Sequence, residues 1–248
     1  MRRYLIASVT ALLMATGTAE AAPVTFFGED LGLGENTRLP SHPNADNARA
    51  SFFSNLVGVG TETFEVIGAG AGTPLGISFP GAGTATLQGS GLTVSEPTGT
   101  NGFGRYPISG NIYWEPGSGT FSIGFSDPVA AFGFYGVDIG DFDGQITLAL
   151  QSGILTNLVV PNTVNGAGGA VLYFGVIDTA NPFSLITFGN TAAGVDVFGF
   201  DDFSIGSVEQ VSLNPVPEPA TILLLGSSLA GLVGAAWKRR RSAQPTSD

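Results

Sequence analysis

The sequence of 248 residues contains no cysteine, a single histidine and few basic residues. The absence of thiols excludes a cysteine nucleophile, a zinc–thiolate site and an iron–sulfur cluster. The one histidine, His42, lies in a polar Ser-His-Pro-Asn stretch and cannot by itself build a multi-histidine metal site. The chain does not need disulfides, because about 190 residues bury a sufficient core without them.

Basic charge is scarcest in the middle of the chain. Of the 20 acidic and 9 basic residues, three acids and six bases lie outside residues 22–215, which leaves seventeen acids and three bases within that stretch. Such a surface repels nucleic acid and anionic lipid, so we expect no nucleic-acid partner. It suits cations, neutral sugars or simple solubility outside the cell.

The N-terminus has the three parts of a secretory signal peptide. Arg2 and Arg3 precede the apolar stretch LIASVTALLMA, and the small-residue stretch TAEAAP follows it. Ala19 and Ala21 satisfy the small-x-small rule, so residues 1–21 predict a cleaved signal and export by the Sec machinery. The alternative is an uncleaved membrane span, but the apolar stretch is short for crossing a bilayer.

Residues 22–213 predict one antiparallel β-sandwich that is jelly-roll-like. Short apolar or alternating stretches recur there, separated by Gly, Pro, Asn and Asp. In TFSIGF (120–125), for example, Phe121, Ile123 and Phe125 fall on one face, which is typical of a half-buried strand.

One segment departs from the strand pattern. Residues 44–56 carry apolar side chains at helical spacing, and Asn44 precedes them as a cap. The apolar positions are Ala45, Ala48, Phe52 and Leu56. We therefore expect one short helix that covers an end of the sandwich.

The C-terminal tail has three parts. Residues 214–219 contain three prolines and predict a stiff, extended spacer. Residues 220–237 form an uncharged apolar run, just long enough for a transmembrane helix of ~17–25 residues. Residues 238–248 begin with four basic side chains, which predict a cytoplasmic tail and place the β domain on the other side.

Within this tail, Pro217, Glu218 and Pro219, the apolar run and the basic cluster stand in a fixed order. Residues 216–241 thereby resemble the PEP-CTERM sorting signal of exported bacterial proteins. The resemblance implies that a membrane-embedded exosortase recognises the signal and processes the chain near the triplet. It also implies a bacterium that makes extracellular polysaccharide. An ordinary C-terminal anchor is the alternative.

Two groups of carboxylates are candidate calcium ligands. The first is Asp138, Asp141 and Asp143 in DIGDFDG, whose alternative is a solvated turn. The second combines two pairs from distant segments, on the expectation that the first and last strands meet as in jelly-roll carbohydrate-binding modules. Its members are Glu29, Asp30, Asp201 and Asp202, and the alternative is a bulge that turns Asp201 and Asp202 to solvent.

An aromatic group is the candidate for sugar binding. Tyr106, Tyr113 and Trp114 lie close together in the sequence, and pyranose rings stack on aromatic faces. The alternative is that these side chains fill the core of the sandwich, where large aromatic residues are common.

We expect a non-enzymatic surface or matrix protein that binds calcium, glycan or both in biofilm or exopolysaccharide. The tail would hold it transiently in the inner membrane with the β domain in the periplasm, before it reaches the outer surface or matrix. A polysaccharide-active enzyme of the glycoside hydrolase type and a purely structural matrix protein remain alternatives. No GxSxG turn is present, and a pair of acids among seventeen has no diagnostic value.

Overall fold

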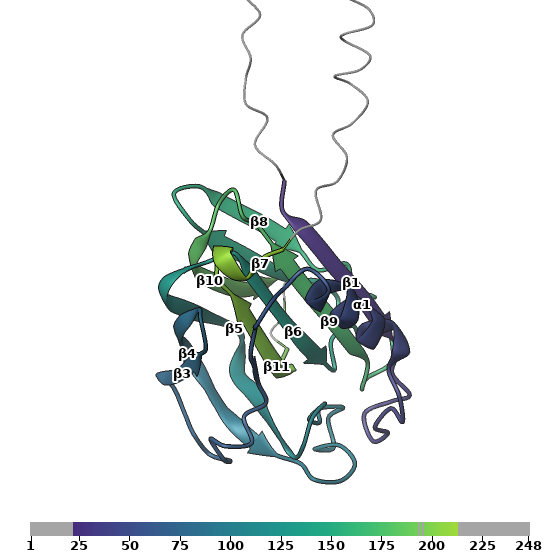
Figure 1. The fold of residues 1–248 in the computed structure, drawn as a ribbon. Coiled ribbons are helices and arrows are strands. Elements are labelled where there is room, and N and C mark those ends of the chain that lie inside the picture. Colours follow the sequence, from purple (N-terminus) through teal and green to yellow (C-terminus); the bar gives the residue numbers. More distant parts are fainter. Residues whose placement is uncertain (1–21, 193, 195, 213–248) are drawn as a thin grey trace, which may run out of the picture.

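The computed structural model describes residues 22–192, 194 and 196–212, which form one curled antiparallel sheet with one α-helix (Figure 1). The predicted signal peptide, proline-rich spacer, membrane helix and basic tail all lie outside these residues. Within the described part of the chain, no helix has the length and apolar character needed to span a bilayer.

Eleven strands and two short helices make up the described fold. The strands are β1 (Val24–Asp30), β2 (Thr61–Glu62), β3 (Leu75–Phe79), β4 (Gly83–Ser95), β5 (Ile112–Val129), β6 (Ala131–Val137), β7 (Ile146–Gln151), β8 (Leu155–Val159), β9 (Val171–Ile177), β10 (Phe183–Asn190) and β11 (Gly199–Gly206). The helices are α1 (Pro43–Phe53) and the 3₁₀ helix η1 (Val208–Gln210).

The sheet curls at β5, which pairs with both of its halves: β1-β9-β6-β11 on one side and β10-β7-β8 on the other. Strand order runs β1-β9-β6-β11-β5-β10-β7-β8, and β4 pairs with β5 and β3. On the side away from β4, the start of β5 meets β11 at Trp114, and its later residues pair with β10. The predicted antiparallel all-β architecture is therefore confirmed, with both layers supplied by one sheet instead of two.

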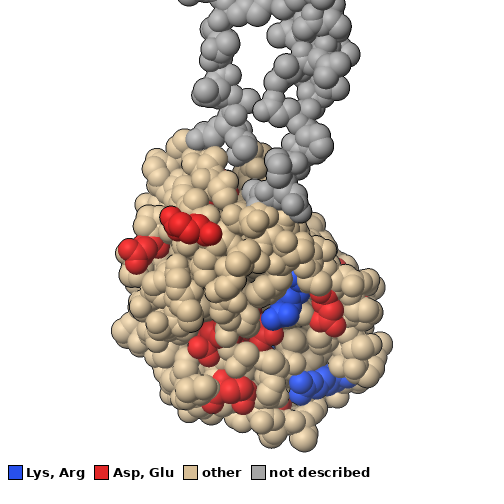
Figure 2. Space-filling model, viewed as in Figure 1, with Lys and Arg blue, Asp and Glu red and all other residues tan. Residues whose placement is uncertain are grey.

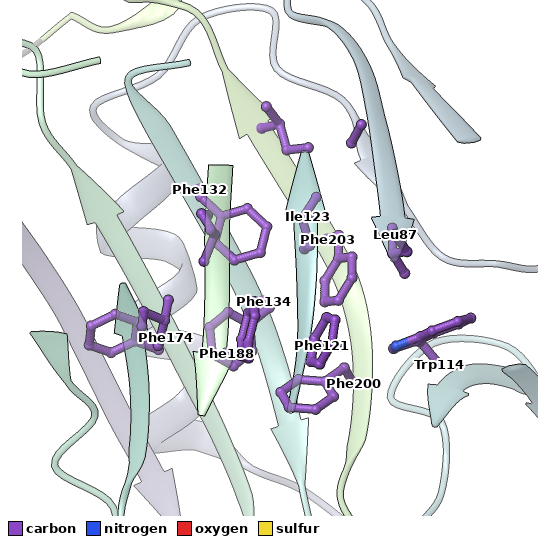
Figure 3. Packing of buried hydrophobic residues seen from close by; sticks show 14 of the residues in the cluster. Leu87, Trp114, Phe121, Ile123, Phe132, Phe134, Phe174, Phe188, Phe200 and Phe203 are labelled. Carbon is purple, nitrogen blue, oxygen red and sulfur yellow. The ribbon is translucent and has the colours of Figure 1, made fainter. Parts of the chain in front are cut away.

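The core lies between the two halves and is filled largely by phenylalanine (Figure 3). The rings of Phe134 on β6 and Phe188 on β10 are 5.3 Å apart, although three strand spacings separate them along the sheet. Phe121 stacks on Phe188 at 4.2 Å. Phe121 and Phe188 are partners on neighbouring strands, so the contact across the curl that holds the halves face to face is that of Phe134 with Phe188.

Helix α1 covers the outer face of β1 and β9. The predicted apolar face is confirmed at Ala45, Ala48 and Phe52, which are buried, whereas Leu56 lies beyond the end of the helix at Phe53. The predicted cap is wrong, because Asn44 lies inside the helix and the N-cap position is His42. The helix N-terminus is satisfied from outside, as Asp30 of β1 accepts from the backbone N of Asn44 (3.3 Å) and Ala45 (2.9 Å).

The two ends of the described domain lie at the same end of the sheet. The pairings of Val24 with Ile177, Ile177 with Ala131 and Ala131 with Gly206 place the start of β1 and the end of β11 at one end of the sheet, with β9 and β6 between them. Figure 1 shows the first and last described residues leaving the domain on that side. The loops with the candidate acidic residues 138–143 therefore lie at the opposite end.

Candidate functional site

The aromatic candidates for sugar stacking are buried. Tyr106, Tyr113 and Trp114 are 1%, 0% and 0% exposed, so none of them offers a ring face to a sugar. Tyr106 instead donates to Gly169 O at 3.0 Å, and Tyr113 donates to Glu115 at 2.9 Å. The expectation of stacking on these rings is wrong, and the alternative of core packing holds.

Asp201 and Asp202 sit at a bulge of β11, and both are buried. The register shifts between Asp201 and Ser204, and Asp202 has a φ of 51°. Asp201 Oδ2 accepts from the backbone N of Ile108 at 2.8 Å and of Ser109 at 3.0 Å. Burial and then the neighbouring Asp202 raise the pKa of Asp201 well above its ordinary value. The alternative of a bulge is correct, but the bulge keeps both carboxylates buried instead of turning them to solvent.

The expected meeting of the first and last strands does not occur. Strands β9 and β6 lie between β1 and β11, a separation of roughly 14 Å at ~4.8 Å per strand. Glu29 is engaged elsewhere, because both of its oxygens accept from Thr163 N at 3.1 and 3.0 Å. Asp30 caps α1. The expectation that these residues share a site with Asp201 and Asp202 is wrong.

Asp138 and Asp141 lie at the loop end of the domain, among other carboxylates. Asp138 is 4% exposed, its Oδ1 accepts from Gly169 N at 2.7 Å, and its Oδ2 is 3.7 Å from Arg105 Nη1. Burial is the main reason that the pKa of Asp138 rises to about 7. Asp138 is thus a structural carboxylate that touches backbone and lies below the surface.

Asp141 is less well satisfied. Burial, followed by the like charges of Asp196 and Glu35, raises its pKa, and its buried Oδ1 has no hydrogen-bond partner. Asp143 is exposed and accepts from Asn165 at 3.2 Å. We call Glu35, Asp138, Asp141 and Asp196 the loop-end carboxylates. As they stand, no three Asp, Glu, His or Cys side chains in the described ranges are grouped to hold a metal ion.

A groove of about 630 Å³ runs between β1 and α1. Strand β1 lines it with residues 26–29, and the helix lines it with Asn44, Asn47, Ala48 and Ser51. Its volume falls within the ~300–1,000 Å³ typical of ligand sites. The register of β1 alternates the side chains of Phe26 and Phe27 between the helix-covered face and the core face, so the groove follows the free edge of the strand.

The lining of this groove is polar, aromatic and almost uncharged. Phe26 and Phe27 are half-buried, and Phe26 packs edge-on against Phe52 at 5.6 Å. Asn47 is exposed, and its side-chain amide has no hydrogen bond to another described residue. Glu29, the one charged lining residue, accepts from Thr163. The face drawn in Figure 2 is likewise mostly uncharged, with its acidic side chains in separate patches.

The sequence alone did not indicate this groove or the full set of loop-end carboxylates. The one feature of the sequence that pointed toward the groove is the position of Asn47 on the polar face of the predicted helix. Glu35 and Asp196 lie in glycine-containing loops far from residues 138–143 in the sequence. Only the fold brings either group together.

Comparison with known proteins identifies the tail. A family model described as the PEP-CTERM protein-sorting motif matches residues 215–241, which confirms the predicted resemblance. No curated protein matches the chain.

Solved structures give weak similarities. The K2 cleaved adhesin domain of Lys-gingipain has 14% identity and a TM-score of 0.37, over 59% of this chain and 97% of that chain. A mutant of the family 29 carbohydrate-binding module CBM29-2 has 16% identity and a TM-score of 0.28, over 54% of this chain and 99% of that chain. Similarities at this level support no argument about the ligand.

Proposed function

We propose that this chain, an exported protein with a PEP-CTERM protein-sorting motif for exosortase at residues 215–241, binds a neutral polysaccharide outside the cell. The tail holds the chain in the inner membrane with the β domain in the periplasm until exosortase acts. The β domain then reaches the outer surface or the extracellular matrix, where it binds glycan.

The observation that carries the glycan proposal is the groove between β1 and α1. A sugar presents apolar C–H faces and many hydroxyl groups, so it needs aromatic surface beside uncommitted donors and acceptors. Phe26 and Phe27 supply the first, and the free amide of Asn47 supplies the second. The absence of basic residues from the lining favours a neutral glycan over an acidic one.

We propose no catalytic step in the groove. Hydrolysis of a glycosidic bond uses two carboxyl groups on opposite sides of the bond. Glu29 is the one carboxylate of the lining, and Thr163 occupies it. Asp138 has a raised pKa, as a general acid would, but it is buried against Gly169 and does not reach the groove lining.

The test is binding of the full chain to extracellular polysaccharide isolated from its own host. We expect Asn47→Ala to weaken binding by about tenfold, because one hydrogen-bonding group is lost. Asn36→Ala is the matched control, since Asn36 is also exposed and its side chain has no hydrogen bond within the described structure. No binding by the wild-type chain, or release of reducing sugar from the polysaccharide, would contradict the proposal.

A bound cation is the second candidate, and one observation favours it. The buried Oδ1 of Asp141 lacks a partner, and the like charges of Asp196 and Glu35 lie nearby. Calcium takes oxygen ligands at weak extracellular sites, so a small movement of the loop-end carboxylates around an ion would relieve both costs.

Calcium at millimolar concentration should then raise the melting temperature of the wild-type chain. Asp141→Asn should remove that rise, whereas Asp143→Asn should keep it, because Asp143 is exposed and already paired with Asn165. A melting temperature that calcium leaves unchanged would rule this candidate out.

A further inference from the structure

Strand β8 forms a free edge of the sheet. In the described residues it pairs with β7 alone. Val160 N donates to Ile146 O at 2.8 Å, and backbone groups alternate in direction along a strand. The N–H and C=O groups of Leu155, Asn157 and Val159 therefore point away from the sheet.

This edge carries no charge, although the chain has a net charge of −11. Ile154, Leu155 and Val159 are 55%, 60% and 51% exposed. Natural proteins usually protect a free edge with lysine, proline, a charged side chain or a covering element. Residues 154–160 contain no proline and no charged side chain.

The other free edges of the described sheet are better protected. Along β1, the side chain of Asn44 on α1 donates to Glu29 O at 3.0 Å, and Asp30 adds a charge to the strand. Strand β3 has 5 residues, as β8 does, but Pro74 and Pro80 adjoin both of its ends, whereas Pro161 lies two positions beyond the last residue of β8. By comparison, the outward N–H and C=O groups of β8 have no strand partner in the described sheet and no charged side chain beside them, so another strand can pair with them.

We propose that β8 pairs in antiparallel orientation with β8 of a second copy of this chain, about a two-fold axis at Asn157. In this register Asn157 faces its own counterpart, and Leu155 faces the counterpart of Val159 in both directions. The outward N–H and C=O groups of all three residues then exchange hydrogen bonds with the other copy. On the opposite face of the strand, Thr156 meets the counterpart of Leu158.

A second copy is the partner because the strand is complementary to itself in this register. The central amides can hydrogen-bond to each other, and an apolar pair lies on each side of them. The negative charge of each copy opposes contact over most of the surface, whereas this edge brings no like charges together. Two short strands bury less than the ~1,200 Å² of a stable interface, so the association requires a high local concentration, as on a cell surface.

Cysteine cross-linking of the full chain tests the pairing, because the chain has no cysteine of its own. In a hydrogen-bonded antiparallel pair the Cα atoms are about 5.5 Å apart, which a disulfide can bridge. We expect Asn157→Cys to form a disulfide-linked homodimer about tenfold faster than Asn36→Cys under mild oxidation. Asn36 is a matched control, since it is also an exposed asparagine.

A second substitution shows whether the edge itself makes the contact. Leu155→Lys, added to Asn157→Cys, should slow cross-linking about tenfold, because it places a charge in the paired edge. Leu33→Lys should leave the rate unchanged, since Leu33 is equally exposed (62% against 60%) but lies outside β8. Melting temperatures within ~2 °C of the parent would show that both variants fold.

The proposal is overturned if Asn157→Cys and Asn36→Cys cross-link at the same rate, or if neither forms a dimer at the highest concentration. It is also overturned if Leu155→Lys has no effect on cross-linking. Disulfides from Asn157→Cys to other proteins, without a homodimer, would assign the edge to a different partner and contradict a second copy.

Discussion

Asp201 and Asp202 in β11, and Asp138 and Asp141 after β6, are two pairs of carboxylates withdrawn from water. In the first pair no buried oxygen lacks a hydrogen-bond partner, whereas Asp141 Oδ1 in the second pair does. Asp201 accepts three backbone N–H groups, two of which belong to the segment around Ile108. Asp138 instead accepts one backbone N–H group, from Gly169, and the buried Oδ1 of Asp141 accepts none from the described residues.

Burial of a carboxylate therefore has two opposite effects on the stability of this domain. Asp201 in β11 hydrogen-bonds to the backbone of the loop at Ile108 and Ser109, so its removal should lower the stability of the fold. At the loop end, the unpaired Oδ1 of Asp141 and the neighbouring like charges raise the free energy of the folded state, so changes to Asp141 should be tolerated or even stabilising. Five variants and one titration test that contrast.

The largest effect is expected at Asp201. Asp201→Ala leaves the backbone N–H groups of Ile108, Ser109 and Asp202 without their acceptor inside the protein. We expect the free energy of unfolding to fall by roughly 3–5 kcal/mol in urea denaturation. Asp143→Ala, at an exposed position, is the control and should change it by less than ~0.5 kcal/mol. A loss below ~1 kcal/mol for Asp201→Ala would show that the buried pair in β11 does not stabilise the fold more than an exposed acid does.

The next effect is a pH dependence at Asp138. Its pKa is raised from 3.8 to about 7 in the folded protein, so the folded state binds the extra proton between these values. The resulting stability is fully present below about pH 4 and is lost as the pH rises through about 7. We expect unfolding free energies measured across this window to fall by about 2–4 kcal/mol.

Asp138→Asn should make that decline shallower, because it removes the titrating group and keeps an acceptor for Gly169 N. The raised pKa values of Asp141, Asp201 and Asp202 leave a residual slope of the same sign. An unchanged slope, or stability that increases with pH across the window, would contradict the assignment.

The smallest effect is a gain in stability at Asp141. Without divalent cations at pH 7.5, Asp141→Asn removes one of several neighbouring negative charges. We expect the free energy of unfolding to rise by about 0.5–1 kcal/mol, since solvent screens part of the repulsion. Asp143→Asn, two positions away and exposed, should leave it unchanged within ~0.5 kcal/mol. A clear loss of stability in Asp141→Asn would place this pair with the one in β11.

Local patterns predicted the strands and the helix because both depend on short periodic spacing. Residues 44–56 gave the correct apolar face for α1, and alternation gave the core face of Phe121 and Ile123. The tail was predicted because its motif is contiguous, and the family match confirms it.

The site was not predictable in the same way, because its parts meet only through tertiary contacts. The sequence predicts Asp30 as a metal ligand, but the packing of α1 on β1 makes it the acceptor for that helix's N-terminus. The sequence leaves open whether Tyr106 and Trp114 are exposed or fill the core, because nothing in a short segment reports which aromatic side chains the curl of the sheet encloses. The groove needs a strand and a helix that are separate in sequence.

We propose that this chain is exported, that exosortase acts on its tail, and that the β domain functions outside the cell. Intact mass spectrometry of the chain from extracellular and membrane fractions tests it most directly. We expect an extracellular form that begins at Ala22 and ends close to Pro217, Glu218 and Pro219. A chain recovered from the inner membrane alone, with its sequence intact to Asp248, would contradict it.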